Sequence, residues 1–297
     1  MPRSLVSILV SLATIATSAR AAEIDWSKLD QALGKPGSIQ PGGVHKWSLP
    51  RTDLKITVDG VQLKPAFALG TWVAFMPTDG NAMLMGDLVL TEDEVSPVMK
   101  KLIDGGVEIS AVHNHLLRTF PAVFYMHVGG HGDPVKMAEA LRAGLALSRT
   151  PIGAPAPGPA PTVDLDMPAL DAALGAKGTA NSGVYQFSLP RVETITDAGM
   201  AVPPSLGTAI AINFQPLGGG KAAITGDFVL MGPEVNPVLK SLRGNDIEVT
   251  ALHSHMVNDS PHVLFMHFWA TGDAVVLARH LRAALDLTNA RRMPPPS

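Results

Sequence analysis

The sequence contains no cysteine, and this absence removes several kinds of chemistry at the outset. It excludes disulfide bonds, thiolate zinc sites, cysteine nucleophiles and the lipid-accepting cysteine of bacterial lipoproteins. Any metal site in this chain must therefore be built from histidine, aspartate and glutamate side chains.

The sequence also lacks an excess of charge of either sign. Its 297 residues carry a formal net charge of −3, and the lysines and arginines are scattered along the chain. A surface that binds nucleic acid normally shows a basic patch or stripe, so we expect no nucleic-acid partner. Hydrophobic residues make up 46% of the chain and charged residues 16%, which allows a globular core.

Long apolar runs are missing beyond the first residues. Arg3 precedes a short apolar run over residues 5–16, and residues 19–21 read Ala-Arg-Ala, the small-x-small pattern of a signal-peptidase site. We predict a signal peptide over residues 1–21 with cleavage after Ala21. A membrane anchor is the alternative, but the run is too short to span a bilayer comfortably. The expected location is therefore periplasmic or secreted, with no stable membrane insertion after cleavage.

The chain repeats itself with an offset of 140 positions, as Arg51 and Arg191 illustrate. The stretch VEISAVHNHLL, which begins at Val107, recurs as IEVTALHSHMV from Ile247. So long a shared register indicates duplication of one domain. We predict a first repeat domain over 22–149, a Pro/Ala/Gly-rich linker over 150–162, a second repeat domain over 163–290 and a tail over 291–297.

Each repeat shows the pattern of an α+β domain. Alternating and β-branched stretches favour a mostly antiparallel sheet, and capped amphipathic stretches favour helices at its flanks. Asp133 and Asp273 are expected to cap the last helix of each repeat. In the first repeat we predict helices over 26–33 and 92–104, strands over 82–90, 106–116 and 122–128, and an antiparallel hairpin between the last two strands.

Three histidines occur at the same positions of both repeats. His113 and His115 lie two residues apart on a predicted strand, so their side chains point to one face. With a turn centred near residues 120 or 121, His127 comes opposite one of them, within reach of a shared zinc ion. The second repeat carries the same set with identical spacing: His253, His255 and His267.

The alternative is that these histidines are polar surface residues, or only form hydrogen bonds in a half-buried sheet. The duplication favours the metal site, because the other four histidines have no histidine counterpart in the other repeat. Zinc is the expected divalent metal, while copper and nickel also accept imidazole ligands. The four unmatched histidines are His45, His131, His262 and His280.

Acidic residues also recur, and they supply candidates for a fourth ligand or a catalytic acid/base. Glu94 and Glu234 are the first choice, although a carboxylate near a helix start also gains from the helix dipole. Asp87 and Asp227 are the second choice, because Gly-Asp at a strand is often turn chemistry.

Arg51 and Arg191 follow the repeated Ser-Leu-Pro motif. Each could bind the carboxylate or phosphate of a substrate, or could pair with one of the recurring acids. The sequence leaves both interpretations open.

Three stretches carry a resemblance to a known family: GDFVLMGPEVNPVLKSL from Gly226, IEVTALHSHM from Ile247 and FMHFWATGDAVVLARHLRAALD from Phe265. With them, nearly all of the mature chain resembles the LppY/LpqO family, exported bacterial proteins built around a domain of unknown function. Named members are lipoproteins, whereas this chain lacks the lipid-accepting cysteine. The His-x-His and later His also resemble the zinc site of acetolactate decarboxylase, which implies an α+β fold with a three-histidine metal site.

Three functions from different classes fit these patterns. The first is a metal-dependent hydrolase or lyase that acts on a small oxygen-rich substrate. The second is a non-catalytic periplasmic metal-binding protein, and the third is a cell-envelope ligand-binding module without metal. The two histidine sets could form independent sites, or could share one cleft about a pseudo-twofold axis.

Overall fold

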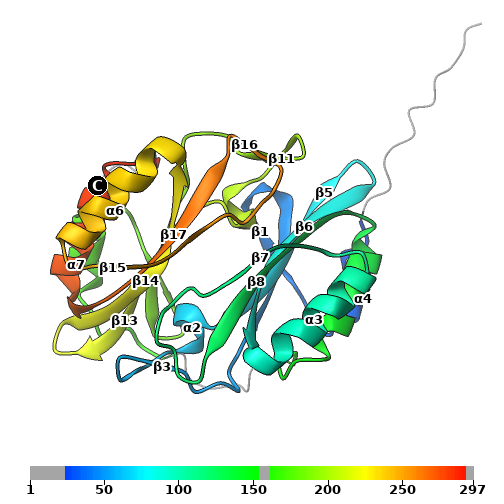
Figure 1. Ribbon diagram of the computed structural model, residues 1–297, viewed down its shortest axis with the longest axis horizontal. Coiled ribbons are helices and arrows are strands. Elements are labelled where there is room, and N and C mark those ends of the chain that lie inside the picture. Colours follow the sequence, from blue (N-terminus) through cyan, green and yellow to red (C-terminus); the bar gives the residue numbers. More distant parts are fainter. Residues whose placement is uncertain (1–23, 154–160, 292–297) are drawn as a thin grey trace, which may run out of the picture.

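The computed structural model describes residues 24–153 and 161–291. Two lobes lie side by side, each with a sheet facing the centre of the molecule and helices on the outside (Figure 1). The chain is therefore α+β and consists of two tandem domains, as the sequence predicts. The predicted signal peptide, the centre of the predicted linker and all of the tail except Arg291 lie outside the described residues.

The first domain begins with a helix and ends with one. Its elements are α1 (Trp26–Leu33), β1 (Ser38–Gln40), η1 (Pro41–Gly43), β2 (Val44–Pro50), β3 (Thr57–Val58), β4 (Val61–Gln62), α2 (Pro65–Ala68), β5 (Gly70–Thr78), β6 (Asn81–Thr91), α3 (Glu92–Asp104), β7 (Glu108–His113), β8 (Val123–Gly132) and α4 (Pro134–Leu145).

The second domain repeats this order with small changes in its loops. Its elements are α5 (Met167–Leu174), β9 (Thr179–Asn181), β10 (Val184–Leu189), β11 (Thr196–Asp197), β12 (Met200–Ala201), η2 (Pro204–Leu206), β13 (Ile210–Gly218), β14 (Lys221–Met231), α6 (Gly232–Gly244), β15 (Glu248–His253), β16 (Asp259–Ser260), β17 (Val263–Asp273) and α7 (Ala274–Leu285).

Each domain is organised around a six-stranded antiparallel sheet. The strand order is β1-β2-β5-β6-β8-β7 in the first domain and β9-β10-β13-β14-β17-β15 in the second. The long central strands β6 and β14 are each paired along nearly their whole length with β8 and β17. The same topology in both halves is the structural counterpart of the sequence repeat.

Strand β6 shows why each sheet is buried on both faces. Leu84, Leu88 and Leu90 belong to the core beneath helices α3 and α4. The alternate positions face the other way, because successive side chains of a strand point to opposite faces. Val89 packs in an apolar cluster that contains residues of both domains, and Asp87 points to the same side. The central strands therefore carry a helix-facing side and a side that faces the partner domain.

Helix starts follow the predicted capping chemistry. The Asp133 carboxylate accepts hydrogen bonds from the backbone N–H groups of Val135 and Lys136 at the start of α4. Asp273 does the same for α7. Helix α3 covers the predicted 92–104 range, and none of the described helices is long and apolar enough to cross a membrane.

The hairpin that carries the first histidine set differs from the prediction in length and register. Strand β7 ends at His113, so His115 lies in the connection that follows and not on the strand. His127 pairs with Ala111, and His113 pairs with Tyr125, so neither expected pairing occurs. The hairpin is centred on Thr119, one position earlier than expected, and a bulge at Ser110 interrupts the ladder.

A buried ion pair joins β2 to the start of α3. Arg51 is fully buried, and it donates hydrogen bonds to Glu94 and to the carbonyl of Val89. The Glu94 carboxylate also accepts the backbone N–H groups of Thr91 and Arg149. Burial alone would raise the pKa of Glu94, but these hydrogen bonds outweigh it and hold the pKa at about 2. The pair fixes the junction between the sheet and α3.

Replacing Glu94 by glutamine is expected to lower the free energy of unfolding at neutral pH by about 3 kcal/mol, because it removes one charged partner of a buried arginine. The folded-state pKa of about 2 lies below the ordinary 4.5. The stabilisation is therefore complete above pH 4.5 and is lost as the pH falls towards 2. Urea unfolding of both proteins across this range measures the difference.

The exposed neighbour Glu92 provides the matched control, because Glu92→Gln removes a charge from the same helix turn without touching Arg51. Its effect should stay within a few tenths of a kcal/mol. A difference between wild type and Glu94→Gln that does not shrink in acid would contradict the assignment.

Candidate metal centre

The six recurring histidines meet at the interface between the two domains. His113 and His253 end strands β7 and β15, and His127 lies on β8. His267 occupies the equivalent place on β17, while His115 lies in a loop next to its strand. His255 lies in the corresponding loop of the second domain. One shared cluster is formed, not two separate sites.

The rings pack in three pairs, and each pair takes one ring from each domain. The centroids of His113 and His253 are 3.7 Å apart. His115 stacks on His267, and His127 lies against His255 with its ring tilted, each at 3.8 Å between centroids. Exchanging the two domains maps each of these contacts onto itself or onto another of the three. The cluster therefore follows the pseudo-twofold symmetry of the duplicated chain.

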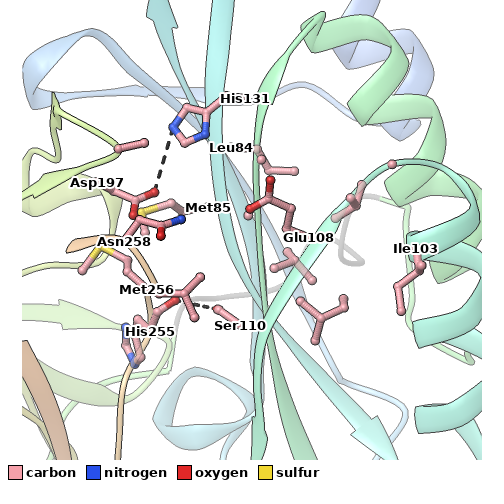
Figure 2. A pocket seen from close by; sticks show the side chains of 18 residues that line it. Leu84, Met85, Ile103, Glu108, Ser110, His131, Asp197, His255, Met256 and Asn258 are labelled. Atoms are coloured by element: carbon pink, nitrogen blue, oxygen red, sulfur yellow. Dashed lines mark hydrogen bonds and ion pairs between the residues drawn. The ribbon is translucent and has the colours of Figure 1, made fainter.

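Two reciprocal hydrogen bonds hold the histidine loops in place. The Ser110 hydroxyl donates to the carbonyl oxygen of His255, and the Thr250 hydroxyl donates to that of His115, each at 2.6 Å. Both hydroxyls lie where a bulge interrupts the pairing of β7 or β15. Figure 2 shows Ser110 reaching His255 across a pocket of about 610 Å³ between the domains. A bulge re-aims one side chain, and here each re-aimed side chain crosses to the other domain.

Backbone carbonyls orient two of the rings. His267 Nδ1 lies 2.9 Å from the carbonyl oxygen of Gly226, and since a carbonyl only accepts, Nδ1 carries the proton. His127 is similarly hydrogen-bonded to the backbone of Gly86. In each ring Nε2 is then left as the nitrogen with a free lone pair. Such outer hydrogen bonds are typical of histidines that ligate a metal.

The spacing of nitrogen atoms fits shared metal ligation. His127 Nε2 and His253 Nε2 are 3.4 Å apart. Two ligands at about 2.0–2.1 Å from a tetrahedral zinc are about 3.3–3.4 Å from each other. The donor atoms of three histidine triads all lie within 4.8 Å of one another: His113/His115/His127, His113/His253/His267 and His127/His253/His255.

The first of these triads is the one that the sequence predicts for the first domain. Among the described residues, the matching triad of the second domain, His253/His255/His267, does not form a group within that limit. Two of the triads instead combine rings of both domains. No sequence spacing could reveal them, because residues more than 120 positions apart come together.

Two carboxylates complete the cluster. Asp87 pairs with His127 across β6 and β8, and Asp227 pairs with His267 across β14 and β17. Asp87 Oδ2 lies 3.4 Å from His115 Nε2, and Asp227 Oδ2 lies 3.6 Å from His255 Nε2. These separations exceed the roughly 2.7–3.2 Å of a hydrogen bond but suit two ligands of one ion. Asp227, His255 and His267 also form a triad within 4.8 Å.

Many polar atoms of the cluster have no partner in the described structure. Buried polar atoms are normally hydrogen-bonded, so a concentration of orphans at one place needs an explanation. The carboxylate oxygens and one nitrogen of each neutral ring can donate a lone pair, and a cation would engage several of them together. They are Asp87 Oδ1, His113 Nδ1 and Nε2, His115 Nε2, Asp227 Oδ1, His253 Nδ1, His255 Nε2 and His267 Nε2.

Burial keeps the histidine rings neutral. It lowers the pKa of His113 to about 4, and burial together with the neighbouring His113 ring lowers the pKa of His267 to about 3. Burial likewise holds the pKa of His115 and His255 well below the ordinary value. A neutral imidazole is the form that binds a metal ion, so these rings are ready to ligate at neutral pH.

Burial acts on the two carboxylates in the opposite sense. It raises the pKa of Asp87 to about 8, against the attraction of Lys46, and it raises that of Asp227 well above the ordinary range. Both directions follow from the cost of a charge in a medium of low polarity. A bound cation would reverse this balance and favour the ionised acids.

A pocket of about 710 Å³ leads to the cluster. Asp87, Asp227, His127 and His255 lie on its wall, together with Lys46. The sequence alone did not single out Lys46, because its counterpart in the second repeat is Gln186 and the lysine therefore carries no repeat signal. The reciprocal hydroxyl residues could have been found, since both repeats place Ser or Thr three residues before the first histidine.

The predicted carboxylates and arginines lie in a different environment. Glu94 and Glu234 accept hydrogen bonds of 2.7 to 3.2 Å from Arg51 and Arg191 at the starts of α3 and α6. In the described structure none of these four residues belongs to the donor groups of the histidine cluster. Of the two open interpretations for the arginines, the structure shows pairing with the recurring acids. Asp87 and Asp227 are the acids beside the histidines.

No curated protein matches the chain. A trimeric bacterial microcompartment shell protein, PduB, is 13% identical and aligns over 87% of this chain and 96% of its own, with a TM-score of 0.23. EtuB from Clostridium kluyveri is 9% identical, with 88% and 96% covered and a TM-score of 0.21. Likenesses this low carry no argument about this protein.

The family comparison is more informative. One family model matches residues 27–147 and again residues 168–287, which together span most of the chain. The two matches coincide with the two lobes and their shared histidine positions. The chain therefore belongs to the family described as Domain of Unknown Function (DUF1259), and it carries two tandem copies of that domain.

Proposed function

We propose that the shared histidine cluster binds a divalent metal ion, with zinc as the expected ion, and that this centre hydrolyses or cleaves a small oxygen-rich substrate. The observation that carries the proposal is the 3.4 Å separation of His127 Nε2 and His253 Nε2, two nitrogens supplied by different domains. The backbone contact of His127 with Gly86 leaves a lone pair on its Nε2, and in the His253 tautomer protonated at Nδ1 both Nε2 atoms present lone pairs that a bound ion would engage together.

The donor set suits zinc, copper or nickel. His127, His253 and His255 would supply three imidazole nitrogens, a common set for a catalytic ion. Such an ion lowers the pKa of a bound water to about 7 or polarises a carbonyl group. The neutral rings and the outer hydrogen bonds to Gly86 and Gly226 prepare the ligands before the ion arrives.

Proton transfer falls to Asp87 or Asp227 in this proposal. Both acids lie on the pocket wall and next to the histidines, whereas Glu94 and Glu234 are engaged by arginines. A carboxylate beside the substrate can accept a proton and release it again during turnover. The pocket of about 710 Å³ has room for a small substrate beside these groups.

A second candidate function is non-catalytic metal binding. The cluster offers six imidazoles and two carboxylates, more donors than one catalytic ion requires. A centre that fills every coordination position with protein atoms would store or buffer metal. The access of the pocket to Asp87, His127 and His255 favours catalysis over storage.

Export and the narrower family name remain part of the proposal. The pattern over residues 1–21 supports a signal peptide with cleavage after Ala21 and a periplasmic or secreted location. The tandem domain of unknown function supports kinship with the LppY/LpqO group. The expected partner is then a small molecule or a metal ion met outside the cytoplasm.

Metal content of single and double variants tests whether the domains share an ion. His127→Ala and His255→Ala lie in different domains, and each is expected to remove the same metal equivalent. The double variant should then lose no more metal than either single variant, because both changes strip one centre. Elemental analysis after dialysis against zinc measures the content, and zinc should raise the melting temperature of the wild type.

His131→Ala is the matched control, since His131 lies outside the cluster and is 4.0 Å from Asp197. It should keep the wild-type metal content. Losses that add up in the double variant would indicate two independent sites, and a wild type without metal would refute the metal centre.

Turnover of a small chromogenic ester, p-nitrophenyl acetate, tests catalysis. The zinc-loaded protein should hydrolyse it, and the chelated protein should not. Asp87→Asn is expected to lower kcat by about 10²-fold, because amide cannot take up the proton. Zinc content is measured on the same samples.

Asp104→Asn supplies the control, because Asp104 is exposed and pairs only with Lys100 at the end of α3. Its kcat should match that of the wild type. Tight zinc binding without an exchangeable water and without turnover would favour the storage function.

A further inference from the structure

Lys46 lies in the pocket that reaches the cluster, where its ammonium contacts an aromatic ring and is attracted to the Asp87 carboxylate. Its Nζ lies 4.1 Å from the ring centroid of Trp72, which holds the ammonium over an aromatic face. Within the described residues, no hydrogen bond or ion pair engages this Nζ. An ammonium has three donors, and both Lys46 and Trp72 line the pocket. The lysine is thus placed to receive an acceptor from solution.

The second domain has lost this arrangement. The residue equivalent to Lys46 is Gln186, whose side-chain amide donates to the Ala66 carbonyl and to Asn213. Trp72 pairs with Asp87 across β5 and β6, whereas the residue that pairs with Asp227 is Ala211. The duplication therefore keeps its ligands symmetric but places a cation on one side only.

Residues of the first domain also close the position beside Gln186 that is equivalent to the pocket beside Lys46. Lys64, next to helix α2, donates through Nζ to the Gly183 carbonyl and through its backbone N–H to Gln215. Phe67 packs edge-on against Trp269 in the shared apolar cluster. The pocket beside Lys46 is instead bordered by Pro203, Pro204 and Gly207, which leave it open. A ligand therefore meets Lys46 when it approaches the cluster.

Charge in the pocket selects the kind of anion. Lys46 contributes one positive charge, and Asp87 and Asp227 share the same wall. A divalent metal and Lys46 together outweigh the two ionised acids by one positive charge, so a monoanion balances the site and a dianionic phosphate exceeds it. A single carboxylate matches one ammonium, and the proline-lined wall suits a small organic body.

We propose that Lys46 binds the carboxylate of a small carboxylic acid, whose second oxygen function then faces the histidine cluster. This assignment rests on the proposed metal function for the second oxygen but not for the carboxylate contact. It narrows the oxygen-rich substrate to an acid of the hydroxy or oxo type, and it makes Lys46 a substrate-binding residue. The first domain then supplies specificity, while both domains supply ligands.

Calorimetric titration of glycolate into the zinc-loaded full chain tests the proposal. Lys46→Gln, which copies the residue of the second repeat, should weaken glycolate binding by about tenfold or more, because it removes a charge-assisted contact. Lys46→Arg should stay within a few-fold of wild type. Lys100→Gln, an exposed charge removal on α3, should bind as wild type does. Zinc content should be equal in all four proteins.

Several results would overturn the assignment. These are wild-type protein that does not bind glycolate, Lys46→Gln that binds it as tightly as wild type, or inorganic phosphate that binds more tightly than glycolate. Zinc retention and glycolate binding separate the two proposals. If the protein fails to retain zinc but binds glycolate in a Lys46-dependent manner, the anion subsite is sustained and the metal centre is refuted.

A measurement on the wild type guards against a variant that does not fold. Glycolate should slow the acetylation of Lys46 by acetic anhydride, read by mass spectrometry, and should not slow that of Lys100. Equal protection of both lysines, or of neither, would count against the subsite.

Discussion

The two hydrogen bonds from Ser110 to His255 and from Thr250 to His115 are the contacts on which the arrangement of the site depends. Each hydroxyl belongs to one domain and each carbonyl to the other, so neither domain alone positions its own histidine loop. The bulges in β7 and β15 turn the hydroxyls across the interface. Because the contacts are reciprocal, duplication of one domain is enough to create both, and the histidines of both domains then converge.

Burying the polar groups of the cluster costs free energy, and the packing around the cluster offsets that cost. An apolar cluster with Val89, Tyr125 and Trp269 spans the interface and excludes water from its edge. Inside, neutral rings and protonatable acids keep the net charge low. In the proposed metal centre, the same low polarity that makes orphaned nitrogens costly would strengthen their interaction with a cation.

In the proposed function, symmetry is kept at the metal ligands and broken where the substrate would enter. All six histidines and both aspartates recur, yet the positions of Lys46 and Trp72 correspond to Gln186 and Ala211 in the other half. The recurring Glu94 and Arg51 have a different reason to persist, because a buried arginine requires its carboxylate. A residue that recurs in both repeats can therefore belong either to the fold or to the site. The burial of its side chain and the groups that it contacts distinguish the two cases.

The amino-acid sequence by itself determined the duplication, the α+β class, the helix caps at Asp133 and Asp273 and the identity of the histidines, because these depend on local pattern and on register between the repeats. Only the tertiary structure decided that both histidine sets form one cluster, that His115 lies beyond its strand and that Asp87 joins it. The physical reason is that a one-residue change in hairpin register, a bulge and the docking of two domains are set by long-range packing. Residues more than 120 positions apart have no local signal for their meeting.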